Sequence, residues 1–240
     1  MRRLGWTIVL GTALVGLVAA GAPHGAQSAG SITGQVKFTG AKPANAKIDM
    51  SEEPKCAEKH KTAPMTETVV GQPSALANVF VYVKSGLPAD YKPTTPPTAV
   101  VLDQDGCQYK PHVLGIQTGQ NLEIRNSDPV LHNIKAKATK NRPFNISQPT
   151  AGMKTNRTFS AAEVMVALEC NVHGWMNSFL AVLPHPFFTV TGMDGSFQIR
   201  GLPAGTYTLE AWHEKYGVQT ATVTVTGTDS KITQFTFAAK

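Results

Sequence analysis

Residues 164–184 read VMVALECNVHGWMNSFLAVLP. Two apolar runs rich in valine and leucine, VMVALEC and FLAVLP, flank a short loop. Runs of this length and composition, bounded by turn residues, are typical of β-strands. The loop carries Cys170, His173 and Met176, whose sulfur and imidazole groups can bind a metal ion. The segment therefore predicts two strands joined by a candidate metal-binding loop.

Short stretches of strand-like sequence continue on both sides of this segment. They are rich in β-branched and aromatic residues, and turns containing glycine or proline separate them. We expect strands at 31–38 (SITGQVKF), 77–83 (ANVFVYV), 99–102, 113–118, 121–126, 133–138, 187–191, 196–199, 206–213, 218–226 and 231–237. The polar stretch 139–156 is expected to be a long surface loop. This pattern predicts an all-β chain, built as a sandwich or a closed barrel.

The composition excludes several classes of protein. With 42% hydrophobic and 16% charged residues among 240, the chain can bury a core and is not a disordered tail. The formal charge of +6 comes from 22 basic and 16 acidic residues. The basic residues are scattered and form none of the Lys/Arg blocks that nucleic-acid binders show. We therefore expect no nucleic-acid partner.

The N-terminus has the pattern of a secretory signal peptide. Two arginines precede an apolar run at 4–20, and Ala26 and Ser28 are placed as the small residues of a cleavage site. Cleavage after Ala20 and an uncleaved anchor are the alternatives, although the run is shorter than the roughly 20 residues that a membrane span needs. We expect residues 1–28 to be removed, leaving a periplasmic or secreted protein without a membrane span.

The chain has 3 cysteines, an odd number for an oxidising compartment. Cys170 lies in the candidate metal-binding loop, which makes it the cysteine expected to stay unpaired. By elimination, Cys56 and Cys107 are expected to form a disulfide, with two free buried thiols as the alternative.

His132 completes a set of four candidate ligands, namely His132, Cys170, His173 and Met176. A thiolate and two imidazoles in a trigonal arrangement, with a weak axial thioether, suit copper because soft sulfur stabilises Cu(I) and imidazole tolerates Cu(II). We expect His132 to reach the loop from the end of a neighbouring strand. The alternatives are zinc, or no metal with Met176 filling the core beside Trp175.

Two segments resemble the ligand segments of the cupredoxins, the small blue copper proteins. They are 125–134 (RNSDPVLHNI) and 167–176 (ALECNVHGWM), and the Cys-x-x-His-x-x-Met loop is most similar to amicyanin and its pseudoazurin and plastocyanin relatives. The resemblance extends over about 96–184. It implies a Greek-key β-sandwich that binds one type 1 copper ion.

The same resemblance implies roles for individual residues. The equatorial ligands would be His132, Cys170 and His173, and the axial ligand Met176. Asn133 matches the residue that holds the ligand loop through hydrogen bonds in the family. Trp175, between two ligands, is expected to shield the site or to pack the loop. Gly174 departs from the family pattern, where many members have proline, and this puts the rigidity of the loop in doubt.

A second resemblance concerns the C-terminal part. Residues 194–213 (DGSFQIRGLPAGTYTLEAWH) resemble the carboxypeptidase regulatory-like, or transthyretin-like, β-sandwich, assigned here to 185–240. The early strands of that family typically read like those in the N-terminal β segment, 31–95. We therefore expect one sandwich made from both ends of the chain, with the cupredoxin domain, 96–184, inserted into it. The simpler alternative is two consecutive domains.

The function expected from these features is one-electron transfer by a single type 1 copper ion between periplasmic redox partners, such as a cytochrome or a dehydrogenase. His173 is expected to be the exposed exit for the electron. No carboxylate pair or Ser/His/Asp order indicates an enzyme. The alternatives are a copper carrier or storage protein, and a carbohydrate-binding or scaffold module in which copper is structural.

Overall fold

The computed structural model describes residue 1 and residues 29–239, so the expected signal peptide at 1–28 lies, apart from residue 1, outside the described residues. The elements are β1 (Gly30–Thr39), α1 (Pro54–Ala57), β2 (Phe80–Ser85), β3 (Val100–Gln104), β4 (Tyr109–Lys110), β5 (Val113–Gln117), β6 (Asn121–Asn126), β7 (His132–Ala136), β8 (Phe144–Gln148), β9 (Lys154–Thr158), β10 (Glu163–Glu169), β11 (Asn177–Leu183), β12 (Phe188–Val190), β13 (Ser196–Leu202), β14 (Gly205–His213), β15 (Gly217–Val225) and β16 (Ser230–Ala238). Among these residues, no helix has the length and hydropathy to cross a membrane.

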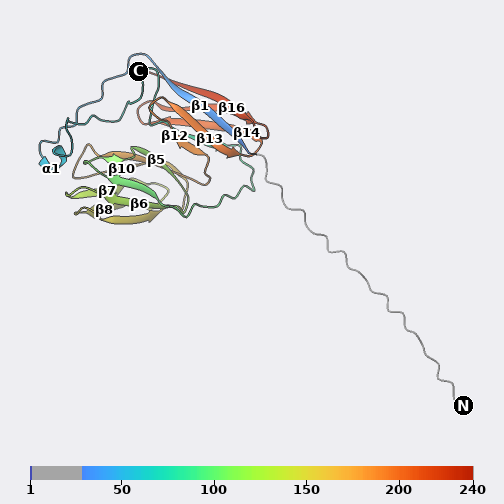
Figure 1. The fold of residues 1–240 in the computed structure, drawn as a ribbon, viewed down its shortest axis with the longest axis horizontal. Helices are drawn as coiled ribbons and strands as arrows, with labels where there is room; N and C mark the ends of the chain where they lie inside the picture. Colours follow the sequence, from blue (N-terminus) through green and yellow to red (C-terminus); the bar gives the residue numbers. More distant parts are fainter. Residues whose placement is uncertain (2–28, 240) are drawn as a thin grey trace.

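The strands form four sheets, with the orders β13-β1-β16, β12-β2-β14-β15, β5-β11-β10-β7-β8 and β4-β3-β6-β9. β1 pairs with β13 and β16, and β2 pairs with β12 and β14. The chain therefore begins one sandwich, builds a second from β3 to β11, and returns to finish the first (Figure 1). We call β3–β11 the inserted sandwich and the other strands the outer sandwich. This pairing is that of the inserted arrangement, and the expected all-β sandwich fold is confirmed.

Strand β2 joins the two sandwiches because both of its faces are buried. Val81 and Val83 pack into the core of the outer sandwich. Phe80 and Tyr82 point the other way and pack with Val113 of β5 and other residues of the inserted sandwich. Side chains alternate between the two faces of a strand, so ANVFVYV, apolar at every position after Asn78, supplies both layers. The four sheets are thus stacked, with the sheets of β2 and β5 in the middle.

Gly115 of β5 lies where the two sandwiches meet. A Cβ atom built there would lie 2.6 Å from Phe188 Cε2 and 2.7 Å from Phe80 Cε2, and these two rings stack with centroids 5.5 Å apart. We expect Gly115→Ala to lower the free energy of unfolding by about 1–3 kcal/mol, because overpacking displaces buried rings. Chemical denaturation measures this. Val218→Ala, at an exposed position, should change it by less than about 0.5 kcal/mol, and an equally small effect of Gly115→Ala would contradict the close packing.

The segment expected to be a surface loop, 139–156, contains regular structure instead. β8 pairs with β7, and β9 pairs with β6, so each lies at the edge of its sheet. Both strands expose polar side chains, and β9 reads KTNRT with no large apolar residue. β9 therefore lacks the apolar alternation that identifies a strand from sequence, and in β8 the alternation is limited to Phe144 and Ile146.

The connection from β1 to β2, which we call the strap (residues 40–79), crosses to the inserted sandwich. It contains α1, and its Ile48, Met50 and Cys56 belong to the hydrophobic core of the inserted sandwich. The predicted disulfide is present and joins Cys56 of the strap to Cys107, with Cα atoms 5.6 Å apart. The sequence here is polar and contains several prolines. The part around α1 is thus fixed on the inserted sandwich, whereas Val69, Leu76 and Val79 pack in the core of the outer sandwich.

Candidate metal centre

The four predicted ligands come from one end of one sheet. His132 is the first residue of β7, and Cys170 follows the last residue of β10. These strands are antiparallel neighbours, with Glu169 opposite Lys135, so the start of one and the end of the other lie side by side. His173 and Met176 lie in the loop that leads from Cys170 into β11, three and six residues after Cys170.

Three of the four ligands converge on one point. His132 Nδ1 lies 3.0 Å from His173 Nδ1, and Cys170 Sγ lies 3.8 Å from His173 Nδ1. One ligand atom from each of the three residues lies within 4.8 Å of the others. All three side chains are buried, His132 completely. Two donors bound at about 2.0 and 2.3 Å to one ion can be at most about 4.3 Å apart, and the separations of 3.0 and 3.8 Å fit that limit.

Met176 closes the ligand loop. Its backbone N–H donates to the carbonyl of His173 at 2.9 Å, and its carbonyl accepts from the N–H of Cys170 at 3.2 Å. The side chain is buried and belongs to the same hydrophobic cluster as Cys170. The backbone of Met176 therefore holds Cys170 and His173 in place, and its thioether lies in the buried surroundings of the site.

The thiol of Cys170 is prepared to act as a thiolate. Burial alone would raise its pKa, but hydrogen bonds with His132 and His173 lower the pKa to about 5. The backbone N–H of His173 also points at Cys170 Sγ, at 3.4 Å. A thiol that is ionised near neutral pH can bind a metal ion without an added cost of deprotonation.

Asp128 is a functional residue that the sequence analysis missed. Its Oδ2 lies 3.0 Å from His132 Nε2, and the residue is completely buried. Lys59 Nζ lies 3.1 Å from Oδ1. Burial alone would raise the pKa of Asp128, but His132, two backbone N–H groups and Lys59 hold it well below its usual range. A carboxylate here places the proton of His132 on Nε2 and turns the lone pair of Nδ1 towards the site.

Asn133 and Trp175 lie where the sequence analysis expects support for the site. The side-chain Oδ1 of Asn133 accepts from the N–H of Asn171 at 2.7 Å and lies 3.4 Å from Cys170 Sγ. Trp175 packs on His173 with ring centroids 5.1 Å apart, and its Nε1–H donates to the carbonyl of Cys107 at 2.9 Å. Asn133 thus ties β7 to the ligand loop, and Trp175 ties the loop to the disulfide.

The expectation that His173 is exposed is wrong. Only 3% of its surface is accessible, because the strap covers it. Cys56 Sγ lies 3.8 Å from His173 Nε2, so the disulfide is in contact with the ring edge that faces away from Cys170. The sequence indicates that Cys56 and Cys107 can pair, but it does not show that their disulfide packs against His173.

The donor set fits copper better than zinc. Two imidazole nitrogens, one thiolate and a thioether buried in the same hydrophobic cluster are the donor types of mononuclear electron-transfer copper sites. Structural zinc prefers four strong tetrahedral ligands, and thioether is not among them. His132 Nδ1 and His173 Nδ1 face each other at 3.0 Å, and a bound cation satisfies both lone pairs.

Comparison with known proteins gives partial likenesses. A family model described as polysaccharide lyase family 4, domain II, matches residues 158–234, less than half of the chain. It is not the carboxypeptidase regulatory-like family that the sequence resembles. The matched residues run from the end of β9 into β16 and include the ligand loop. No curated protein matches the sequence.

Solved structures similar to the chain include copper proteins. A copper-containing nitrite reductase from Thermus scotoductus SA-01 is 20% identical over 42% of this chain (TM-score 0.35). The match covers 26% of the reductase, so this chain spans about a quarter of its length. A Cu(I) amicyanin variant is 18% identical over 44% of this chain and 98% of its own (TM-score 0.32). A purple cupredoxin from Nitrosopumilus maritimus is 24% identical over 31% of this chain and 81% of its own (TM-score 0.28). At these TM-scores, the assignment depends on the site residues themselves.

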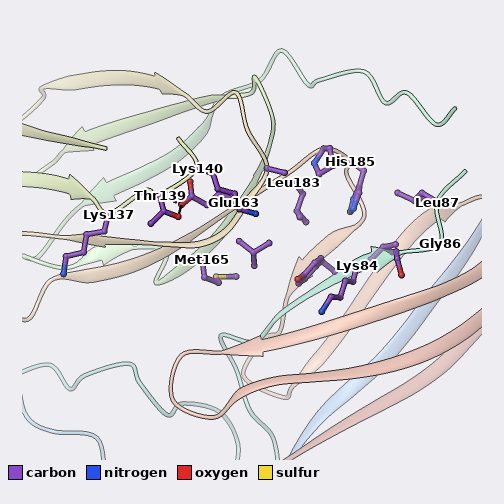
Figure 2. Close-up of a pocket in the computed structure, with 16 residues that line it drawn as sticks. Lys84, Gly86, Leu87, Lys137, Thr139, Lys140, Glu163, Met165, Leu183 and His185 are labelled. Atoms are coloured by element: carbon purple, nitrogen blue, oxygen red, sulfur yellow. Dashed lines mark hydrogen bonds between the residues drawn. The ribbon is translucent and has the colours of Figure 1, made fainter. Parts of the chain in front are cut away.

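A cleft of about 780 Å³ lies between the two sandwiches, and none of the four candidate ligands lines it. Figure 2 shows its two walls. The lining residues of the inserted sandwich include Lys137, Thr139, Lys140, Glu163 and Met165, and those facing them include Lys84, Gly86, Leu87 and His185. The cleft is lined by one tyrosine, Tyr82, and by no phenylalanine or tryptophan of the described residues; Tyr82 is buried and donates its hydroxyl to Glu210 at 2.5 Å.

Glu163 in this cleft holds the segment that follows β7. Its carboxylate accepts from the N–H of Thr139 at 2.5 Å and from the N–H of Asn141 at 3.0 Å. Burial alone would raise its pKa, but these hydrogen bonds lower it from 4.5 to about 2.

A carboxyl group whose pKa is lower in the folded than in the unfolded state stabilises the folded protein. This contribution is complete at a pH above the unfolded-state pKa and is lost as the pH falls through the folded-state pKa. We therefore expect stability to fall between about pH 4.5 and pH 2, and we expect Glu163→Gln to make the decline shallower in this window. Denaturation at a series of pH values measures both curves. Equal slopes would contradict this role for Glu163.

Proposed function

We propose that the protein is an exported type 1 copper protein that carries single electrons between redox partners. One copper ion would be held by His132, Cys170, His173 and Met176. The observation that supports this most is the buried convergence of two imidazole Nδ1 atoms and one low-pKa thiol. Copper bound there would supply the Cu(I)/Cu(II) couple, which is a one-electron change.

The residues around the site favour electron transfer because they resist movement. Asp128 fixes the ring of His132, Asn133 fixes the ligand loop, and the backbone bonds between Cys170 and Met176 close that loop. Ligands held by their own hydrogen bonds keep one geometry in both oxidation states. Such a site needs no general base, nucleophile or open coordination position, so we propose no enzymatic step.

We place the contact face for a redox partner beside the ligands. Leu131 and Val172, each next in sequence to a histidine ligand, are 43% and 48% exposed. With His173 covered by the strap, we propose that the electron passes through this apolar surface to a cytochrome or dehydrogenase partner. Redox encounters of this kind use small, transient interfaces. The Cys56–Cys107 disulfide supports a periplasmic or secreted location, where disulfides persist.

Two other functions have less support. A copper carrier or storage protein needs a metal that exchanges readily, and the burial of His132, Cys170 and His173 argues against this. A carbohydrate-binding module is suggested by the name of the matching family model. Sugar-binding grooves usually carry exposed aromatic side chains that stack on the sugar, whereas the aromatic side chains that line the cleft between the sandwiches, Tyr82 and His185, are both buried.

Spectroscopy of the copper-loaded protein tests the proposal. The mature chain is mixed with Cu(II), and its visible absorption and electron paramagnetic resonance are recorded beside those of Cys170→Ala. We expect an intense charge-transfer band that is absent from the variant, because the band requires a copper–thiolate bond. A reductant should bleach the band, and an oxidant should restore it. A colourless protein, or a band that survives in Cys170→Ala, would overturn the proposal.

A further inference from the structure

A second group of potential metal ligands lies directly beside the first. Cys56 Sγ, Cys107 Sγ and a ring nitrogen of His173 lie within 4.8 Å of one another. The nitrogen nearest to Cys56 is His173 Nε2, at 3.8 Å, while Nδ1 of the same ring faces Cys170 and His132. All three side chains are buried. His173 therefore lies between two sulfur-containing groups, one on each side of its ring.

In the folded oxidised chain the sulfurs of Cys56 and Cys107 are bonded to each other and cannot act as thiolates. Both are free thiols in the newly made chain before the disulfide forms. A dithiol reductant restores that state. It gives two electrons and two protons to the S–S bond, forming two protein thiols, and becomes a disulfide itself.

We propose that, with the disulfide reduced, Cys56, Cys107 and His173 Nε2 bind one Cu(I) ion. Two thiolates and an imidazole form a soft donor set, which selects monovalent copper. Each thiol loses its proton when the ion binds. The separation of 3.8 Å between Cys56 Sγ and His173 Nε2 fits two donors that share an ion at about 2.3 and 2.0 Å.

Other contacts keep the two cysteines together when the S–S bond is open. Asp128 accepts from the N–H of Cys107 at 2.7 Å, which fixes that loop next to the inner site. On the strap, Lys59 Nζ lies 3.1 Å from the same carboxylate, and His60 Nε2 lies 2.7 Å from the carbonyl of Gly106. The side chain of Cys56 also lies in the hydrophobic core of the inserted sandwich. Reduction therefore leaves several contacts holding α1 over His173.

The site gives the strap a role in loading copper. An ion bound to Cys56 and Cys107 would lie on the outer nitrogen of a residue whose inner nitrogen belongs to the proposed electron-transfer site. A small-molecule disulfide would then oxidise the two thiolates: it takes their two electrons and two protons from solvent, becomes two thiols, and leaves the Cys56–Cys107 bond formed. The outer ion would be released and the inner site left covered. This role rests on the proposed function, whereas binding of Cu(I) by the reduced chain does not.

The test uses the Cys170→Ala variant, in which the inner thiolate is missing. The protein is reduced with a dithiol, freed of it by anaerobic gel filtration, and titrated with Cu(I) against a chromophoric Cu(I) chelator. We expect one equivalent to bind to the reduced protein and none to the oxidised protein. The matched control is Cys170→Ala with Cys56→Ala and Cys107→Ala, which should bind none in either state. Adding His173→Ala to Cys170→Ala should weaken binding by the reduced protein at least tenfold.

Three results would overturn the site. They are no binding to reduced Cys170→Ala, binding that persists without Cys56 and Cys107, and affinity that is unchanged by His173→Ala. Near-ultraviolet circular dichroism reports whether the reduced variant is folded. If it is unfolded, Cu(I) should restore the folded signal, since an ion bound by the native geometry stabilises the native state, and no recovery would also overturn the site. If the oxidised wild-type protein with Cu(II) showed no blue band, the inner copper site would be refuted, but the outer Cu(I) site would not.

Discussion

Replacing Cys56 and Cys107 together by alanine is expected to lower the free energy of unfolding of the metal-free protein by about 4 kcal/mol. The disulfide joins residues 51 positions apart, and a cross-link of this span removes much conformational freedom from the unfolded chain. Guanidinium denaturation of the wild type and of the double variant, both without metal, measures the difference. The same variant should also release copper faster to a chelator, because the strap that covers His173 is no longer covalently fixed.

Cys170→Ala is the matched control for this experiment. Like the pair, it removes a buried sulfur from the inserted sandwich, but it breaks no cross-link. Cys170→Ala should lower the free energy of unfolding by about 1 kcal/mol, the usual effect of a single substitution. If the double variant lost no more than Cys170→Ala, the disulfide would not be what holds the strap, and the noncovalent contacts of Lys59 and His60 would suffice.

The parts of the site that sequence predicts are those in which neighbours along the chain are neighbours in space. Cys170, His173 and Met176 lie on one loop, so their spacing alone brings them together. His132 needs one further inference, that β7 begins beside this loop, and the ligand segments that resemble those of cupredoxins supply it. Asp128 was missed although it lies four residues before His132, because an acidic residue before a proline reads equally well as part of a turn.

The strap could not be placed from the sequence because its position depends on contacts between distant residues. A prediction that Cys56 pairs with Cys107 joins two points of the chain but does not say which surface the disulfide covers. Burial of His173 follows from that surface, and so the expected exposure of this ligand was wrong. A weakly apolar segment with several prolines carries no periodic signal that would reveal its packing.

Strand β2 shows why the arrangement of the two sandwiches was only partly predictable. Its run of apolar residues indicates a strand, but continuous apolarity fits a strand with one buried face and a few tolerated exposed residues, or one with two buried faces. Only the pairing of β2 with β14, and the packing of Phe80 and Tyr82 on β5, shows that it lies between two cores.

The carboxylate of Asp128 is expected to contribute to both the stability of the protein and the affinity of the metal site. In Asp128→Asn, the free energy of unfolding of the metal-free protein should fall by about 3 kcal/mol, because a buried side chain loses the charge that accepts hydrogen bonds from His132, Lys59 and two backbone N–H groups. The carboxylate accepts from the N–H groups of Gly106 and Cys107 at 2.8 and 2.7 Å, and an amide cannot accept at both oxygen positions. Guanidinium denaturation measures this loss.

Copper affinity should fall as well, by about 10- to 100-fold, because Asp128 fixes the tautomer and orientation of His132. Competition with a chelator measures the affinity of folded Asp128→Asn. The matched control is Asp105→Asn, because Asp105 also contacts Lys59, at 3.4 Å, but has a side chain that is 43% exposed. Its stability should change by less than about 1 kcal/mol, and its copper affinity should stay at the wild-type value. If both variants bound copper like the wild type, orientation of His132 by Asp128 would be refuted, since Asp128 would then hold only the Cys107 loop.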